Sequence, residues 1–157
     1  MRKNIISFVV CFLVVLSYNA QEHIVEADKV ITPNWESSFK KALKKSKKEK
    51  KPVLIYFTGS DWCGPCKVLD KNLFHTQKFK DLADKDLILY EANNPRNKDL
   101  VEAERMKENY KLISKYKVRS YPTLVFVNHK GRMIGYKKGL ILTEYYYPFI
   151  QSVIENY

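Results

Sequence analysis

Cysteine is scarce in this sequence, with three residues in 157: Cys11, Cys63 and Cys66. A structural zinc site needs four ligands, and Cys63 and Cys66 have no second cysteine pair to complete one. The histidines are also few, three in all, and they are scattered without metal-ligand spacing. We therefore predict no metal site, and we interpret the Cys63/Cys66 pair as redox-active rather than as half of a metal site or an inactive remnant.

Long apolar runs are missing as well. The run at residues 5–16 is broken once by a serine and is shorter than the roughly 20 residues that a membrane-spanning helix needs. Arg2 and Lys3 precede it, and a polar stretch that ends at Ala20 follows, which is typical of a secretory signal peptide. We predict that residues 1–20 are a signal peptide cleaved after Ala20.

Removal of this segment changes the cysteine count. A lipidated lipoprotein cysteine is the alternative role for Cys11, but the residues at 8–10 before it are not small, and apolar residues continue after it. We assign Cys11 to the discarded peptide, which leaves Cys63 and Cys66 as the only cysteines of the mature chain. No other disulfide can then form within it. We expect an exported protein, located in the periplasm or alternatively secreted.

The strongest motif is Trp-Cys-Gly-Pro-Cys-Lys at residues 62–67. It follows an apolar run at 53–57 that predicts a buried strand, and Pro65 suits the first turn of a helix. Unpaired N–H groups and the positive end of the helix dipole favour an anion at this junction. We therefore expect Cys63 to ionise near neutral pH and act as the nucleophile. Cys66, one helical turn on, is the predicted resolving thiol.

This motif resembles the active site of the thioredoxin superfamily, in which the same run follows a central strand. The resemblance covers the chain from Trp35 to its C-terminus. It implies that four further motif residues support the redox pair: Trp62, Gly64, Pro65 and Lys67. Core packing is the alternative role for Trp62. The loop at 93–98 and a long helix after it are similar to exported thioredoxin-like proteins of Gram-negative bacteria, although this match is weaker than the motif.

A second resemblance to the family lies around Pro122. In the family, a proline before the last hairpin has a cis peptide bond and packs beside the cysteine pair. This implies that Tyr121, Pro122 and Thr123 bind substrate, with the Tyr121 backbone open to pair with an extended chain. An ordinary trans proline at the start of a strand is the alternative.

The element order predicts an α/β fold. Helices are expected at 33–51, 64–74, around 79–83, at 98–116 and from Thr143 onward, and strands at 53–57, 87–92, 124–127 and 132–136. Two buried helix faces are expected, formed by Ala103, Met106, Tyr110 and Ile113 and by Phe149, Ile150, Val153 and Ile154. Right-handed crossovers give a mixed sheet with helices on both faces, as in the thioredoxin fold. We predict a leader at 21–33 and one thioredoxin-like domain at 34–157.

One position departs from the thioredoxin pattern. Thioredoxins carry a buried acid on the central strand beneath the resolving cysteine, where it can accept the thiol proton. The corresponding position here falls at Tyr56 or Phe57, and neither is a carboxylate. We therefore expect water or a substrate group to take the proton of Cys66.

Basic residues outnumber acidic ones, giving a formal net charge of +11, and lysines crowd residues 40–51. Such a cluster can bind nucleic acid or an anionic membrane. However, five residues in this region recur at the spacing of a buried helix face: Trp35, Phe39, Ala42, Leu43 and Ser46. We interpret the lysines as the solvated face of this helix and expect no nucleic-acid partner.

The functional prediction is a thiol-disulfide oxidoreductase that reduces disulfides in exported proteins. The Gly-Pro pair between the cysteines resembles thioredoxin, a reductant with a potential of about −270 mV. Nothing in the chain predicts a cofactor such as NADPH or flavin, so we expect a membrane-borne electron donor and a monomeric enzyme. The alternatives are a disulfide oxidase or isomerase, and a binding module that uses the basic helix or the helix after residue 98.

Overall fold

The computed structural model describes residues 31–157, so the predicted signal peptide and most of the leader lie outside the described residues. The elements in chain order are α2 (Phe39–Glu49), β1 (Val53–Thr58), α3 (Gly64–Leu69), the π-helical turn η2 (Asp70–Phe74), α4 (Gln77–Asp86), β2 (Ile88–Asn93), the 3-10 turn η3 (Lys98–Leu100), α5 (Ala103–Lys115), β3 (Thr123–Val127), β4 (Met133–Lys138), the 3-10 turn η4 (Thr143–Tyr145) and α6 (Tyr146–Glu155). Within residues 31–157, no helix is both long and apolar enough to cross a membrane.

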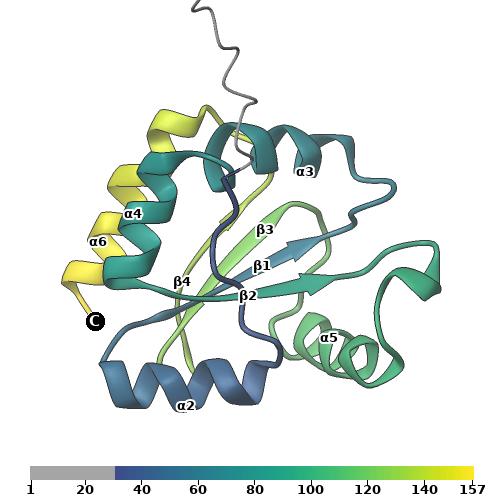
Figure 1. Ribbon diagram of the computed structural model, residues 1–157, viewed down its shortest axis with the longest axis horizontal. Coiled ribbons are helices and arrows are strands. Elements are labelled where there is room, and N and C mark those ends of the chain that lie inside the picture. Colours follow the sequence, from purple (N-terminus) through teal and green to yellow (C-terminus); the bar gives the residue numbers. More distant parts are fainter. Residues whose placement is uncertain (1–30) are drawn as a thin grey trace, which may run out of the picture.

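The four strands form one mixed sheet in the order β2-β1-β3-β4 (Figure 1). β1 pairs in parallel with β2 and antiparallel with β3, and β3 pairs antiparallel with β4. The connection from β1 to β2 runs through α3, η2 and α4, as a parallel pair requires. The predicted mixed sheet and its terminal hairpin are confirmed.

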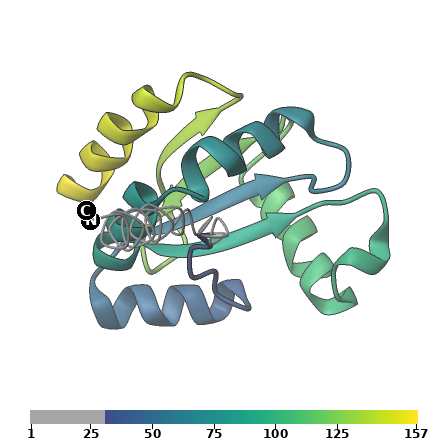
Figure 2. The ribbon, with the colours of Figure 1, turned by 45° about the horizontal axis from the view of Figure 1, so that its top comes forward.

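Helices cover both faces of the sheet (Figures 1 and 2). Side chains of β1 alternate between two buried clusters, because successive residues of a strand point to opposite faces. Leu54 and Tyr56 join the cluster with α3, η2, α4 and α6. Ile55 and Phe57 join the cluster with α2 and α5. All six residues of β1 are buried, which confirms the expectation of a strand buried on both faces.

The first helix begins later than predicted. α2 starts at Phe39, where the Ser38 side chain accepts a hydrogen bond from the Lys41 N–H, and Pro33 does not open a helix. Trp35 instead forms an isolated parallel bridge with Leu89 at the edge of β2. A side-chain cap that satisfies an open N–H group therefore sets the start of the helix at Ser38.

The basic helix is otherwise amphipathic as predicted. Phe39, Ala42 and Ser46 are buried, and most of the lysines are exposed to solvent: Lys40, Lys41, Lys44, Lys47, Lys48 and Lys50. Ser46 is fully buried, and its hydroxyl is satisfied there by a hydrogen bond that it donates to the Lys51 carbonyl at 2.6 Å. The lysines thus form the solvated face of α2.

The predicted buried face of α5 is only partly correct: Met106 is buried and Ile113 packs half-buried against the core, as expected. Ala103 and Tyr110 are exposed, whereas Met106, Asn109 and Leu112 are buried. Asn109 explains the difference, because it accepts a hydrogen bond from the Tyr90 hydroxyl at 2.7 Å and donates one to the carbonyl of residue 93 at 2.8 Å. A buried amide with partners on two sides fixes the face of a helix that hydrophobic spacing alone assigns incorrectly.

The C-terminal helix packs against the sheet as expected. Ile150 and Val153 are buried, and Phe149 and Ile154 pack against the same cluster while keeping some exposure. Tyr146, at the start of α6, is also fully buried and donates a hydrogen bond to the Gly139 carbonyl at 2.7 Å. This contact ties α6 to the segment that leaves β4.

Candidate active site

The motif cysteines lie at the junction between β1 and α3, as predicted. Cys63 is the N-cap residue of α3, and Pro65 occupies the first turn. The two sulfur atoms form a disulfide with an S–S distance of 2.01 Å and a Cα–Cα distance of 5.2 Å. The Cys63 Sγ also accepts a hydrogen bond from the Cys66 N–H at 3.2 Å. A helix N-terminus therefore faces the sulfur of Cys63, where it stabilises a negative charge.

The two cysteines differ in their surroundings. Cys66 is fully buried and Cys63 retains 3% exposure. The motif residues Gly64, Pro65 and Lys67 are exposed around them. Cys63 is consequently the slightly less buried residue of the pair.

The Trp62 ring packs on the motif loop, residues 59–63 between β1 and α3. Its indole N–H donates to the Asn94 carbonyl at 2.9 Å, and its ring meets Tyr121 edge to face at a centroid distance of 5.3 Å. The indole also lies over Gly59, where an added Cβ atom would come within 2.3 Å of it. Asn94 donates from its side chain to the Tyr121 hydroxyl at 3.2 Å. Trp62, Asn94 and Tyr121 thus join three separate segments around the cysteine pair.

The loop at 93–98, which follows β2, is hydrogen-bonded to Asp61, the residue before Trp62. The Asp61 carboxylate accepts hydrogen bonds from the N–H groups of Arg96 and Asn97 at 3.0 Å and 2.9 Å. These backbone hydrogen bonds, with that from Asn97 the strongest, lower the pKa of Asp61. The Arg96 guanidinium lies 5.6 Å from the centre of the Trp62 ring. The loop at 93–98, whose role the sequence leaves unassigned, holds the motif loop in place.

The Tyr121–Pro122 peptide bond is cis, which confirms the expectation for this bond. Pro122 is buried and Tyr121 is half-buried. The Pro122 carbonyl accepts a hydrogen bond from the Gly139 N–H at 2.8 Å. Thr123 is buried, and its hydroxyl donates to the Ser120 carbonyl at 2.8 Å. Through the contact between Trp62 and Tyr121, the structure brings this segment to the cysteine motif.

Polar side chains lie close to the Cys66 backbone, on the side of the sheet that α3 covers. The buried Tyr56 hydroxyl donates to the Cys66 carbonyl at 3.3 Å, and the Asp70 N–H donates to that same carbonyl. Burial holds the pKa of Tyr56 well above its usual range, so the hydroxyl stays protonated. Burial also raises the pKa of Asp70, against opposing effects of the Tyr56 hydroxyl and the charge of His75. This cluster was not predicted from the sequence.

Glu91 is a second half-buried carboxyl group in this cluster. It pairs with Tyr56 in the register of β1 and β2, so its side chain lies on the same face of the sheet. Burial raises the pKa of Glu91, the charge of Arg105 opposes this shift, and the charge of Asp70 adds to it. Glu91 therefore ionises less readily in the folded protein than in the unfolded chain.

We predict that Glu91→Gln stabilises the protein at neutral pH. The pKa of Glu91 is higher in the folded state, so the folded protein favours the neutral carboxyl group. Below about pH 4 Glu91 is neutral in both states and does not destabilise the fold. As the pH rises through the folded-state pKa, the folded protein has to hold the charged form, and stability is lost. Glutamine keeps the shape without the charge, so the free energy of unfolding should rise by about 1 kcal/mol at pH 7. Urea unfolding at pH 7 and at about pH 4 measures the difference, which should vanish at the lower pH.

The control for this prediction is Glu104→Gln. Glu104 is an exposed carboxylate whose pKa is lowered by Lys107, so its replacement should not stabilise the protein at either pH. A Glu91→Gln variant that is less stable than the native protein at pH 7 would show that the Glu91 charge is favourable in the folded state.

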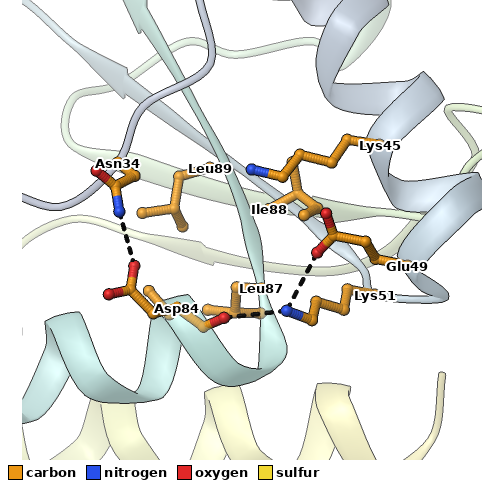
Figure 3. Close-up of a pocket in the computed structure, with 9 residues that line it drawn as sticks. Asn34, Lys45, Glu49, Lys51, Asp84, Leu87, Ile88 and Leu89 are labelled. Carbon is orange, nitrogen blue, oxygen red and sulfur yellow. Dashed lines mark hydrogen bonds and ion pairs between the residues drawn. The ribbon is translucent and has the colours of Figure 1, made fainter.

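The described residues hold no group of three or more histidine, cysteine, aspartate or glutamate side chains placed to bind a metal ion. A cavity of about 280 Å³ lies between α2, α4 and the start of β2 (Figure 3). Lys51 at this cavity is already bound: its ammonium lies 3.2 Å from the Glu49 carboxylate and donates to the backbone carbonyl of Asp84 at 3.0 Å. Since the cysteines follow the end of β1 and β2 runs parallel to it, this cavity lies at the opposite end of the sheet.

Comparison with known proteins identifies the family. A model of the thioredoxin-like domain matches residues 39–153. The chain is 35% identical over 108 residues to a Chlamydia pneumoniae protein named disulfide bond reductase DsbH. This alignment covers 67% of the chain and 64% of that relative, which is less than two thirds of the relative's length.

Solved structures show the same architecture. A structure titled DsbH oxidoreductase superposes with a TM-score of 0.73 and 26% sequence identity, over 88% of this chain and 97% of that one. A putative disulphide-isomerase from Bacteroides thetaiotaomicron superposes with a TM-score of 0.61 and 25% identity, over 82% of this chain and 98% of that one. The cysteine pair, the cis peptide bond, the fold and the matching domain model lead to one conclusion: the chain belongs to the thioredoxin-like domain family.

Proposed function

We propose that this chain is a thiol-disulfide oxidoreductase that reduces disulfides in exported proteins. The observation that carries the proposal is the Cys63–Cys66 disulfide at the N-terminus of α3, with the Cys63 sulfur accepting the Cys66 N–H. The names of the similar proteins, a disulfide bond reductase and an oxidoreductase, support it.

The proposed cycle assigns one role to each sulfur. In the reduced protein, the Cys63 thiolate attacks a substrate disulfide, and one substrate sulfur leaves as a thiolate. Cys66 then attacks the Cys63 sulfur, which breaks the mixed disulfide and releases the second substrate thiolate. The substrate gains two electrons, and the enzyme is left with the Cys63–Cys66 disulfide. Four motif residues support this pair: Trp62, Gly64, Pro65 and Lys67.

The proposed substrate-binding edge comprises Tyr121, Pro122 and Thr123. An extended substrate segment would pair with the backbone of Tyr121 beside the cysteines. Leu140 and Leu142 follow Gly139, which is hydrogen-bonded to Pro122, and both leucine side chains are exposed. This apolar rim suits the unfolded or extended parts of protein substrates.

The proposal includes an exported location. The signal-peptide pattern at residues 1–20 supports export, with the thioredoxin-like domain at 34–157 acting in the periplasm. The electrons would come from a membrane-borne donor, and the enzyme would act as a monomer on disulfide-containing exported proteins.

Two measurements on the purified domain test the proposal. We expect it to reduce insulin disulfides with dithiothreitol as the electron source, and we expect its potential to lie near that of thioredoxin, about −270 mV. A potential above about −180 mV would instead assign the protein as an oxidase or isomerase. A chain that does not exchange disulfides at all would refute the proposed function.

A further inference from the structure

The release step requires a base for Cys66, if the function proposed above is correct. The attacking species in disulfide exchange is the thiolate, and burial in apolar surroundings raises the pKa of a thiol. Cys66 is fully buried. It lies within the first turn of α3, and the N–H group of Cys66 points to the sulfur of Cys63. A residue near Cys66 must therefore take its proton if release is to be fast at neutral pH.

Asp70 is placed to do this. It follows Cys66 by four residues along the continuous helical segment α3–η2, so both side chains lie on one face. Side chains of a helix tilt toward its N-terminus, so the Asp70 carboxylate leans over the turn that holds Cys66. The Asp70 N–H bonds directly to the Cys66 carbonyl.

Tyr56 lies between the sheet and these two residues. Its hydroxyl contacts the Cys66 carbonyl at 3.3 Å and interacts with the Asp70 carboxylate. The Tyr56 ring is fixed by Phe74 and Trp35, with ring centroids 4.5 Å and 6.1 Å away. The Tyr56 hydroxyl therefore lies beside both the Cys66 backbone and the Asp70 carboxylate.

The charged groups around Asp70 lie on β2 and at the end of η2. The charge of Asp70 raises the pKa of Glu91 on β2, and the charge of His75 at the end of η2 lowers the pKa of Asp70. The positive charge of Arg105 on α5 lowers the pKa of Glu91. Because burial raises the pKa of Asp70 above that of an exposed aspartate, this carboxylate is a better proton acceptor than an ordinary surface group.

We propose that Asp70 is the general base that takes the proton of Cys66 in the release step. The Cys66 S–H proton moves to the Asp70 carboxylate, and the Cys66 thiolate then attacks the Cys63 sulfur. The bond between Cys63 and the substrate sulfur breaks, and the electron pair leaves with the substrate thiolate. The substrate thiolate takes a proton from solvent, and Asp70 returns its proton to solvent. The proposed base thus lies on the helical segment α3–η2, and the proposal differs from the expectation that water or a substrate group takes this proton.

Stopped-flow reaction with one equivalent of dithio-bis-nitrobenzoate separates the two steps. Attack by Cys63 releases the first coloured thiolate, and attack by Cys66 on the mixed disulfide releases the second. We expect Asp70→Asn to leave the first phase unchanged and to slow the second about 100-fold near pH 6.5, the usual contribution of a general base. The deficit should shrink as the pH rises, because the Cys66 thiol then ionises increasingly without a base.

The direction and pH dependence of the effect identify the role of Asp70. Loss of a nearby negative charge alone would favour the Cys66 thiolate and accelerate the second phase. A packing role would slow it by the same factor at every pH. Either result overturns the proposal. Asp70→Glu keeps a carboxylate and should retain most of the rate at pH 6.5, so it also tests the proposal if Asp70→Asn does not fold.

Two controls complete the experiment. Asp81→Asn removes an exposed carboxylate on the neighbouring helix α4 and should change neither phase. The native protein tests the proposed function separately. If it releases only the first thiolate, Cys66 does not resolve the mixed disulfide and the oxidoreductase cycle itself fails. If it releases both and Asp70→Asn does so with the same pH profile, only the assignment of Asp70 fails.

Discussion

Replacing Cys63 with serine should abolish disulfide reduction, with the rate of insulin reduction falling by about 10³-fold or more to the level of dithiothreitol alone. Serine has nearly the same size, but its hydroxyl does not ionise near neutral pH. No mixed disulfide can then form at the position that α3 stabilises. The turbidity assay for insulin reduction measures the loss directly.

Cys66→Ser is the matched control for this variant. Both variants lack the disulfide, so they share its loss of stabilisation, but Cys66→Ser keeps the proposed nucleophile. We expect each Cys66→Ser molecule to attack one substrate disulfide and then to stop. The mixed disulfide between Cys63 and the substrate should accumulate and be visible by non-reducing electrophoresis. If Cys63→Ser retained full activity in the native host, the protein would act through binding rather than redox chemistry.

Replacing Phe74 with alanine should have the largest effect on stability, a loss of about 3–5 kcal/mol in the free energy of unfolding. Phe74 is 1% exposed and meets three aromatic rings: Trp35 at 5.4 Å, Tyr56 at 4.5 Å and Phe79 at 4.9 Å between centroids. Its removal leaves a cavity that this rigid cluster cannot fill. Because domains are stable by only about 5–15 kcal/mol, the variant should be partly unfolded near physiological temperature.

Urea unfolding of the reduced and the oxidised protein measures this loss. Val68→Ala is the control, because Val68 lies on α3 with 44% exposure and should cost no more than about 0.5 kcal/mol. A loss below about 1 kcal/mol for Phe74→Ala would mean that the aromatic cluster repacks around the gap.

The active-site motif and the central fold are predictable because they depend on local signals. An apolar run followed by Cys-Gly-Pro-Cys places a strand before a helix, and the spacing of Cys63 and Cys66 puts both sulfurs at its start. The hairpin of β3 and β4 follows from a short turn that contains Gly131, which adopts a φ of 69°. These features need no knowledge of distant contacts.

The features that the sequence does not reveal depend on contacts between distant segments. Tyr90 selects the buried face of α5 through Asn109, which hydrophobic spacing counts as a surface residue. The position of Trp62 depends on Asn94, 32 residues further along the chain. Asp70 could have been found from its spacing to Cys66, but its partial burial beside Tyr56 depends on how α3 packs over the central strand.

A thiolate titration of the Cys66→Ser variant tests the central assignment most directly, because this variant has one thiol at the N-terminus of α3. Ultraviolet absorbance of the thiolate, followed against pH, gives the pKa of Cys63. We expect a value of about 7.5 or lower, within the range of thiols in Cys-x-x-Cys motifs and at helix N-termini. A pKa near 8.5, that of an ordinary cysteine, would contradict the assignment of Cys63 as an activated nucleophile.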